Sequence, residues 1–250
     1  MTVFGDMETS TLSELPKGRS PIATHVVSNH VWFQRTWERV AEEVRAGHQT
    51  YVVCPRIGDL GPDSDQVPGV DKRDVSDEDV DVEFVVDESA PTRELRGVLE
   101  MEAELGDNPA LAGLRIAVLH GRMAADDKDV VMLAFAAGTI DVLVATTVIE
   151  VGVDVANATV MVIMDADRFG ISQLHQLRGR VGRGTSTGLC LLVTETEAEA
   201  IQQRLISVAA TNDGFALARL DLEHRREGDV LGARQSGGKS QLRLLRLLRD

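Results

Sequence analysis

The stretch QLHQLRGRVGRG, Gln173 to Gly184, concentrates arginines and glycines in twelve residues. Guanidinium groups bind phosphate oxygens through two parallel hydrogen bonds, and glycines let the backbone approach another surface closely. Arg180 and Arg183 are three residues apart, about one helical turn, which predicts that both point the same way. Gln176, one turn before Arg180, adds an uncharged hydrogen-bonding group. The pattern predicts contact with the γ-phosphate of a nucleotide, where charge shifts during phosphoryl transfer.

A second polar stretch, ATTVIEVGVDV, follows an apolar run. Ligands of open parallel sheets bind beyond the carboxyl ends of the strands, so we expect a ligand at this position. Thr146 and Thr147 offer hydroxyl groups to a phosphate or to an adjoining loop. Asp154 is placed to accept a hydrogen bond from a ribose hydroxyl. A structural turn would explain Gly152 alone, but not the whole set.

Apolar strands must alternate with helices to position these stretches. Unbroken runs of Val, Leu and Ile between amphipathic helices predict an α/β fold with a parallel sheet and helices on both of its faces. The predicted strands are 22–27, 50–55, 114–121, 140–147, 158–165 and 188–194. The predicted helices are 31–47, 92–105, 124–138 and 172–180, followed by two helices within 197–223 that are broken near Asn212–Gly214.

Composition divides the chain into parts. Residues 1–21 contain turn formers and are expected to be a tail or linker, whereas 22–200 carry the alternation of strands and helices. Within that range, 58–90 is acidic and lacks periodicity, which predicts a disordered insertion, with an acidic partner-binding tail as the minor alternative. The pattern becomes helical near residue 200, and we predict a second unit over 201–250 that ends in a basic helix.

The net charge of −14 is concentrated in that acidic segment. Between Asp59 and Glu88, twelve acidic residues stand against Lys72 and Arg73, a balance of −10. From Arg225 onward there are seven basic and three acidic residues, a balance of +4. The overall acidity therefore does not exclude a polyanionic partner elsewhere on the surface.

Apolar residues make up 43% of the chain, enough for a sizeable core. Cys54 and Cys190 fit no metal or disulfide spacing and are predicted to be buried, inert thiols, so no metal site is expected. No apolar run is long enough to span a membrane, and the first residues do not resemble a signal peptide. The expected compartment is the cytoplasm.

The polar stretches resemble conserved motifs of superfamily 2 helicases. ATTVIEVGVDV resembles motif V, QLHQLRGRVGRG resembles motif VI, YVVCP resembles the strand of motif IV, and LHGRM resembles the DNA-contacting segment between motifs IV and V. Residues 211–237, TNDGFALARLDLEHRREGDVLGARQSG, resemble the translocation motif of the RecG family of branch-migrating DNA translocases. The transcription-repair coupling factor Mfd shares a version of this motif. The ending ARQSG and the opening MTVFGDMETSTLSELPKGR favour the RecG family.

The chain departs from the RecG pattern in two places. Arg226 and Glu227 follow Arg225, where the family usually has glycine, and the acidic insertion over 58–90 is longer than the family's loop.

The resemblance implies the second of two RecA-like domains that sandwich ATP and Mg²⁺, followed by a helical hairpin and a translocation loop. It implies that Gln176, Arg180 and Arg183 reach the γ-phosphate, with Arg183 as the arginine finger. Asp154 would contact the nucleotide or the water shell of the metal, and Gly152 and Thr147 would lie beside it. The residues implied in DNA contact or translocation are His120, Arg122, Thr146, Arg225, Arg234 and Gln235.

The phosphate-binding half of such a motor is missing from the chain. No G-x-x-x-x-G-K-[ST] stretch occurs, and GARQSGGKS, which ends in Gly238, Lys239 and Ser240, lacks the first glycine and follows no buried strand. No acidic DEXH-type motif follows an apolar strand in the required order.

We therefore expect ATP and Mg²⁺ to be held mainly by a separate first RecA-like domain, and the chain to be inactive alone. The expected partners are that domain, an amino-terminal wedge domain of the same protein, and forked or branched double-stranded DNA, with no membrane. The implied role is remodelling of stalled replication forks and branched recombination intermediates. The alternatives are the corresponding domain of an Mfd-type motor, or a non-catalytic interaction module that binds proteins through the acidic loop.

Overall fold

The computed structural model describes residues 22–58, 96–146, 155–184 and 186–222, which form a single six-stranded parallel sheet covered by helices. The strand order is β1-β6-β5-β2-β4-β3. The strands are β1 Ala23–Val27, β2 Gln49–Val53, β3 Ile116–Leu119, β4 Val142–Ala145, β5 Ala158–Ile163 and β6 Leu189–Val193. All five strand pairings are parallel, which confirms the predicted sheet.

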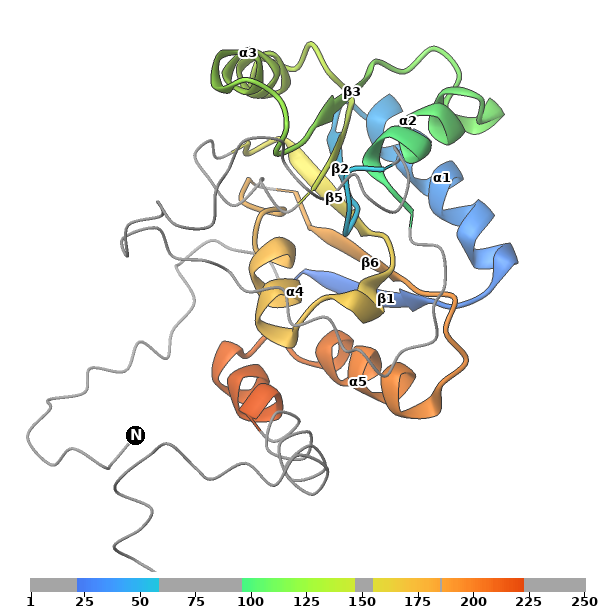
Figure 1. Ribbon diagram of the computed structural model, residues 1–250, viewed down its shortest axis with the longest axis vertical. Coiled ribbons are helices and arrows are strands. Elements are labelled where there is room, and N and C mark those ends of the chain that lie inside the picture. The colour runs from blue at the N-terminus through green and yellow to red at the C-terminus, as the bar shows by residue number, and fades with distance from the viewer. Residues whose placement is uncertain (1–21, 59–95, 147–154, 185, 223–250) are drawn as a thin grey trace, which may run out of the picture.

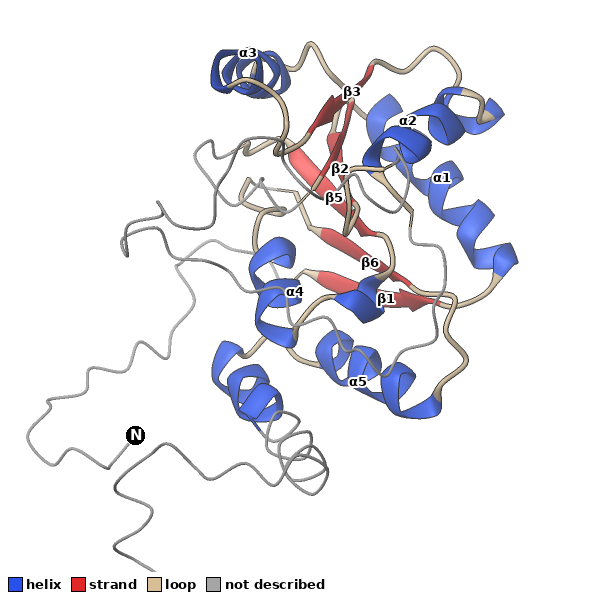
Figure 2. Ribbon diagram, viewed as in Figure 1, coloured by secondary structure: helices blue, strands red, loops and turns tan. Residues whose placement is uncertain are grey.

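Helices cover both faces of this sheet (Figures 1 and 2). The helices are α1 His30–Arg45, α2 Val98–Gly106, α3 Ala125–Ala136, α4 Ile171–Arg178 and α5 Glu199–Ala210, with short 3-10 turns at Pro109–Leu111 and Ala166–Arg168. α1 and α2 pack on one face, and α3, α4 and α5 pack on the other. Successive side chains of a strand point to opposite faces, so Val52 meets the α1 side while Tyr51 and Val53 meet the α3 side.

Local polar contacts define where the elements begin and end. Asn29 caps α1, because its Oδ1 accepts a hydrogen bond from the Trp32 amide at 2.9 Å. The buried Gln49 donates from Nε2 to the carbonyl oxygens of Phe135 and Ile140, at 2.6 and 2.7 Å. These bonds tie the last turn of α3 and the segment before β4 to β2.

The segments on either side of residues 59–95 lie in contact. Arg56 forms a parallel bridge with Gly97, and a Cβ on Gly97 would lie 2.2 Å from the Cα of Gly58. The helix predicted over 92–105 begins only at Val98, because the residues just before it are held against this bridge. Most of the acidic segment and residues 1–21 lie outside the described residues.

α5 and the helical residues 214–222 continue the fold beyond the last strand. Leu205 and Val208 of α5, and Leu217 of the following helix, are buried in the same cluster as β5 and α4. The break at 211–213 lies next to the predicted break at Asn212–Gly214. The change of pattern near residue 200 therefore marks the end of the strands, while the apolar core continues past it.

Both cysteines are buried, as predicted. Burial raises the pKa of the Cys54 and Cys190 thiols to about 12, so both stay protonated at neutral pH. Among the described residues, no helix is long and apolar enough to cross a membrane.

Candidate functional site

The arginine-rich segment, residues 179–184, follows α4 and lies at the amino edge of the sheet. The Gly182 amide donates to the carbonyl of Ala158, the first residue of β5, at 3.2 Å. A Cβ on Gly182 would lie 3.0 Å from the Cα of Gly188, just before β6, and a Cβ on Gly184 would lie 2.7 Å from the carbonyl oxygen of Ala156. These glycines let the segment pack directly against the amino ends of two strands.

The prediction that Arg180 and Arg183 lie one helical turn apart is wrong. α4 ends at Arg178, and the glycine between the two arginines has φ +65°, a left-handed conformation that no helix continues through. Arg183 is exposed, and its Nε donates to the carbonyl oxygen of Gly179 at 3.0 Å. Arg180 is half-buried, and Gln176 is exposed on the last turn of α4. The alignment of these side chains therefore depends on the turn after the helix.

Arg178, to which the sequence assigned no role, is 2% exposed and is one of the largest buried side chains among the described residues. Its Nη1 donates to the carbonyl oxygens of Val208 and Thr211, both at 2.9 Å. Its Nη2 lies 2.8 Å from Nδ1 of His175. Burial lowers the pKa of Arg178, although a guanidinium remains charged. Spacing could have revealed this position, because Arg178 lies seven residues after the buried Ile171 and four after the buried Leu174.

The helices after the last strand attach to α4 and to the turn before it. Ser172 Oγ donates to Asp221 Oδ2 at 3.0 Å, and Arg204 of α5 donates to the carbonyl oxygen of Asp167 at 2.6 Å. The Asp167 carboxylate in turn accepts from Thr194 Oγ1 at 2.6 Å, just after β6. The segment that follows α4 is thus connected through α4 to the pair of helices.

The predicted DNA-contacting residues lie at the carboxyl edge of the sheet. His120 follows β3, Thr146 follows β4, and the Thr146 amide donates to the carbonyl oxygen of Leu119 at 3.2 Å. Arg122 is exposed two residues after His120, and Lys128 Nζ donates to the Gly121 carbonyl at 2.9 Å in the same turn. The structure therefore brings His120, Arg122 and Thr146 together.

Burial lowers the pKa of His120, and the positive charges of Arg122 and Lys128 lower it further. The imidazole is therefore neutral at neutral pH. Its Nδ1 is buried and has no hydrogen-bond partner within the described part of the chain. A nearby anion would favour the protonated imidazole, so this turn is electrostatically suited to phosphate.

These two groups of residues lie on opposite edges of the sheet. A ligand was expected at the carboxyl end of the strand before Thr146, and the arginine-rich segment is at the amino ends of β5 and β6. The chain must return across the sheet between parallel strands, so a segment that follows a crossover helix ends at the amino edge. Thr146 therefore lies at the expected edge, and the arginine-rich segment lies at the other one.

The remaining predicted site residues lie outside the described residues: Thr147, Gly152, Asp154, Arg225, Arg234 and Gln235. Within the described ranges, no three His, Cys, Asp or Glu side chains gather in a way that could hold a metal ion. The binding of Mg²⁺ by another domain stays a prediction.

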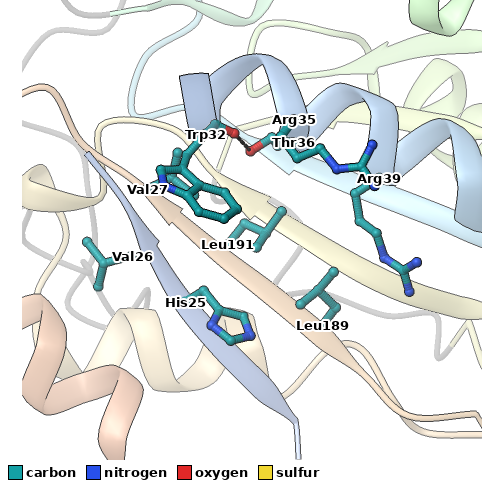
Figure 3. Close-up of a pocket in the computed structure, with 9 residues that line it drawn as sticks. All are labelled: His25, Val26, Val27, Trp32, Arg35, Thr36, Arg39, Leu189 and Leu191. Atoms are coloured by element: carbon teal, nitrogen blue, oxygen red, sulfur yellow. Dashed lines mark hydrogen bonds between the residues drawn. The ribbon is translucent and has the colours of Figure 1, made fainter. Parts of the chain in front are cut away.

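A cavity of about 470 Å³ lies between α1 and the β1–β6 side of the sheet (Figure 3). Leu189 and Leu191 form its floor, and Trp32 and Thr36 of α1 border it. Trp32 is 61% exposed. None of the predicted site residues lines this cavity.

Comparison with known proteins gives consistent matches. The family model described as helicase conserved C-terminal domain matches residues 90–185. The chain is 54% identical to the ATP-dependent DNA helicase RecG of Mycobacterium tuberculosis over 99% of its own length and 31% of that protein. It is 40% identical to RecG of Bacillus subtilis over 95% of its own length and 30% of that protein.

A solved structure of RecG bound to a three-way DNA junction is also similar. It is 35% identical with a TM-score of 0.60, covering 84% of this chain and 23% of that one. The chain thus spans about a third of the length of the curated relatives it matches. An Mfd-type assignment is not favoured by these matches.

Proposed function

Because the chain belongs to the RecG family of ATP-dependent DNA helicases, we propose that it acts as the second RecA-like motor domain of a double-stranded DNA translocase. The observation that carries this proposal is the direct attachment of α4, which leads into the arginine-rich segment, to the helices at 199–222. A motor needs such a connection between the part that senses the nucleotide and the part that moves DNA.

The nucleotide side of the proposal rests on Gln176, Arg180 and Arg183. Arg183 is exposed at the amino edge, and its contact with Gly179 limits the directions in which its guanidinium can point. Guanidinium groups supplied across a domain interface stabilise charge on a transferring phosphoryl group and contribute about 10³- to 10⁵-fold in rate. ATP and Mg²⁺ are held mainly by a first RecA-like domain, with Asp154, Gly152 and Thr147 completing the contact from this side.

The proposed binding of DNA is supported by the residues in the turn after β3. The cations Arg122 and Lys128 beside the neutral His120 suit a phosphate backbone, and Thr146 offers a hydroxyl at the same edge. Contacts of this kind position the protein on DNA without reading sequence and weaken as salt rises. Arg225, Arg234 and Gln235 are proposed to grip the duplex and to convert hairpin movement into a step.

The proposed substrate is branched DNA, specifically stalled forks and recombination intermediates held by a wedge domain of the same protein. The similarity to a RecG bound to a three-way junction supports this choice. The expected compartment is the cytoplasm, where a bacterial chromosome is accessible. The alternative of a non-catalytic module would have no need of the finger-type arginines Arg180 and Arg183.

The test is ATP hydrolysis by the chain alone, by a first RecA-like domain alone, and by their mixture, with and without forked DNA. We expect activity only in the mixture, stimulated by DNA, and at least a thousandfold lower with Arg183→Ala. The matched control is Arg115→Ala, which removes an exposed arginine paired with Asp141 at the amino ends of β3 and β4. Full ATPase activity of the Arg183→Ala mixture would refute the role of Arg183 as arginine finger. ATP hydrolysis by this chain alone would refute the proposal that a first RecA-like domain holds the nucleotide.

A further inference from the structure

The buried Arg178 connects the end of α4 to the hairpin, which consists of α5 and the helical residues 214–222. We propose, building on the proposed function, that Arg178 is a positioning residue that ties the turn at 211–214 to the end of α4. Arg180 follows only two residues later, so displacement of the arginine-rich segment moves this turn with it. Arg178 touches neither nucleotide nor DNA in this assignment.

The acceptors of Arg178 are the unpaired carbonyl groups at the carboxyl end of α5. Val208 is in the last turn of that helix and Thr211 is its cap residue, and both accept from the same Nη1. Carbonyl groups there lack intrahelical partners and carry the negative end of the helix dipole. α5 has no basic residue in its own last turn, so Arg178 supplies the positive charge from another helix.

The charge of Arg178 is not balanced by an acidic side chain. None of the ion pairs among the described residues includes it, and it lies among the buried residues of α4. A buried cation is costly unless its hydrogen bonds are made, so its stability depends on α5 ending where it does. An apolar residue at this position would satisfy packing alone, whereas a guanidinium requires the turn to stay in place.

His175 forms the second half of this joint. Because Arg178 Nη2 can only donate, Nδ1 of His175 accepts, and the ring proton of a neutral imidazole is on Nε2. A Cβ on Gly214 would lie 3.1 Å from that Nε2, so the first residue of the following helix packs against the ring. The imidazole is thus enclosed between Arg178 and the hairpin.

Three residues of α4 at one-turn intervals make these contacts. Ser172 holds Asp221, His175 meets Gly214, and Arg178 holds the end of α5. Residues three apart lie on one helical face, so the hairpin is attached along the whole length of α4. Close-packed interfaces transmit displacement, and Arg178 is the attachment nearest to the arginine-rich segment.

The first experiment measures hydrogen exchange in this chain. The readout is the Leu217 amide, which donates to the Asp213 carbonyl at 3.1 Å, and its neighbours in helix 214–222. In Arg178→Leu these amides should exchange at least about tenfold faster, while amides of β2 and β5 stay as in the wild type. Arg178→Lys keeps the charge but loses the planar guanidinium with its several donors, and we expect an intermediate rate of hydrogen exchange. Unchanged exchange at Leu217 in both variants would overturn the attachment.

The second experiment measures ATP consumed per base pair unwound by a complete RecG-type motor containing this domain. Arg178→Lys should raise that ratio by about fivefold or more, the lower range of allosteric coupling, while Arg115→Leu leaves it unchanged. A loss of ATPase and unwinding in equal proportion would overturn the positioning role and leave Arg178 as a folding residue. A wild-type motor without DNA-stimulated ATPase would refute the proposed function instead, and the exchange result would then decide the attachment alone.

Discussion

Gly184→Ala is the sharpest test of how the arginine-rich segment is held. A Cβ at this position would lie 2.7 Å from the carbonyl oxygen of Ala156, a main-chain atom that cannot rotate away. Ordinary contacts of a Cβ begin near 3.4 Å, so one of the two backbone segments must move by about 0.7 Å. Overpacking of this kind costs about 1–3 kcal/mol. For a chain of this size, that predicts a melting temperature about 2–12 °C lower.

The assay is thermal and urea unfolding of the purified chain, followed by ATPase of the complete motor at a temperature where both proteins are folded. Gly106→Ala is the matched control, because a Cβ there meets nothing within 4 Å and alanine favours the end of α2. We expect the control to be neutral or slightly stabilised. If Gly184→Ala has the same melting temperature as the control, the close approach of Gly184 to Ala156 does not limit the stability of the chain. If Gly184→Ala lowers the stability but leaves the ATPase activity of the motor unchanged, the position of this segment does not matter for catalysis.

Three further predictions follow from the described residues. Replacing residues 59–95 by a linker about one seventh as long should preserve the fold and raise the free energy of unfolding by about 2 kcal/mol, measured by urea denaturation, because the flanking chain already meets at Gly97. The pKa of His120, followed by NMR, should lie below 6.5 and should rise when duplex DNA is added. Because the pKa is lower in the folded than in the unfolded chain, His120 should reduce the free energy of unfolding as the pH falls through 6.5. A pKa that does not change when DNA is added would contradict the DNA site. Cys54 and Cys190, with pKa values of about 12, should react with a thiol reagent at pH 8 only after unfolding, and fast labelling of the native chain would disprove their burial.

The parallel sheet could be predicted because its strands are unbroken apolar runs. β5 and β4 are buried at every position, and only a strand covered on both faces needs that composition. The ends of the helices are harder to predict, because they also depend on contacts between residues that are far apart in the sequence. α2 begins at Val98, where the Glu100 side chain caps the Gly97 amide and Gly97 packs on Gly58, and the second contact joins residues far apart in the sequence.

The identity of the site residues could be predicted from residue type, but their arrangement could not. Arg180 and Arg183 looked like helical neighbours because the residues before them are helical, but α4 ends at Arg178 and the backbone of Gly182 is left-handed. Arg178 has the same side chain as its two neighbours and the opposite environment. Residue type identifies a group that can bind phosphate, whereas periodicity on α4 decides whether that group faces solvent or the core.

The separation of the two sites by the sheet explains why α4 carries so many contacts. His120 and Thr146 lie at the carboxyl edge and Arg183 at the amino edge, so no side chain can reach from one to the other. The sheet is expected to stay fixed, because its strands are hydrogen-bonded to one another and β2, β4 and β5 are buried at every position. α4 runs from one edge to the other on the surface of that sheet, and the hairpin is attached to it by side chains rather than by a ladder of main-chain bonds. Movement between the edges is therefore expected to occur as a shift of α4 together with the hairpin against a fixed sheet.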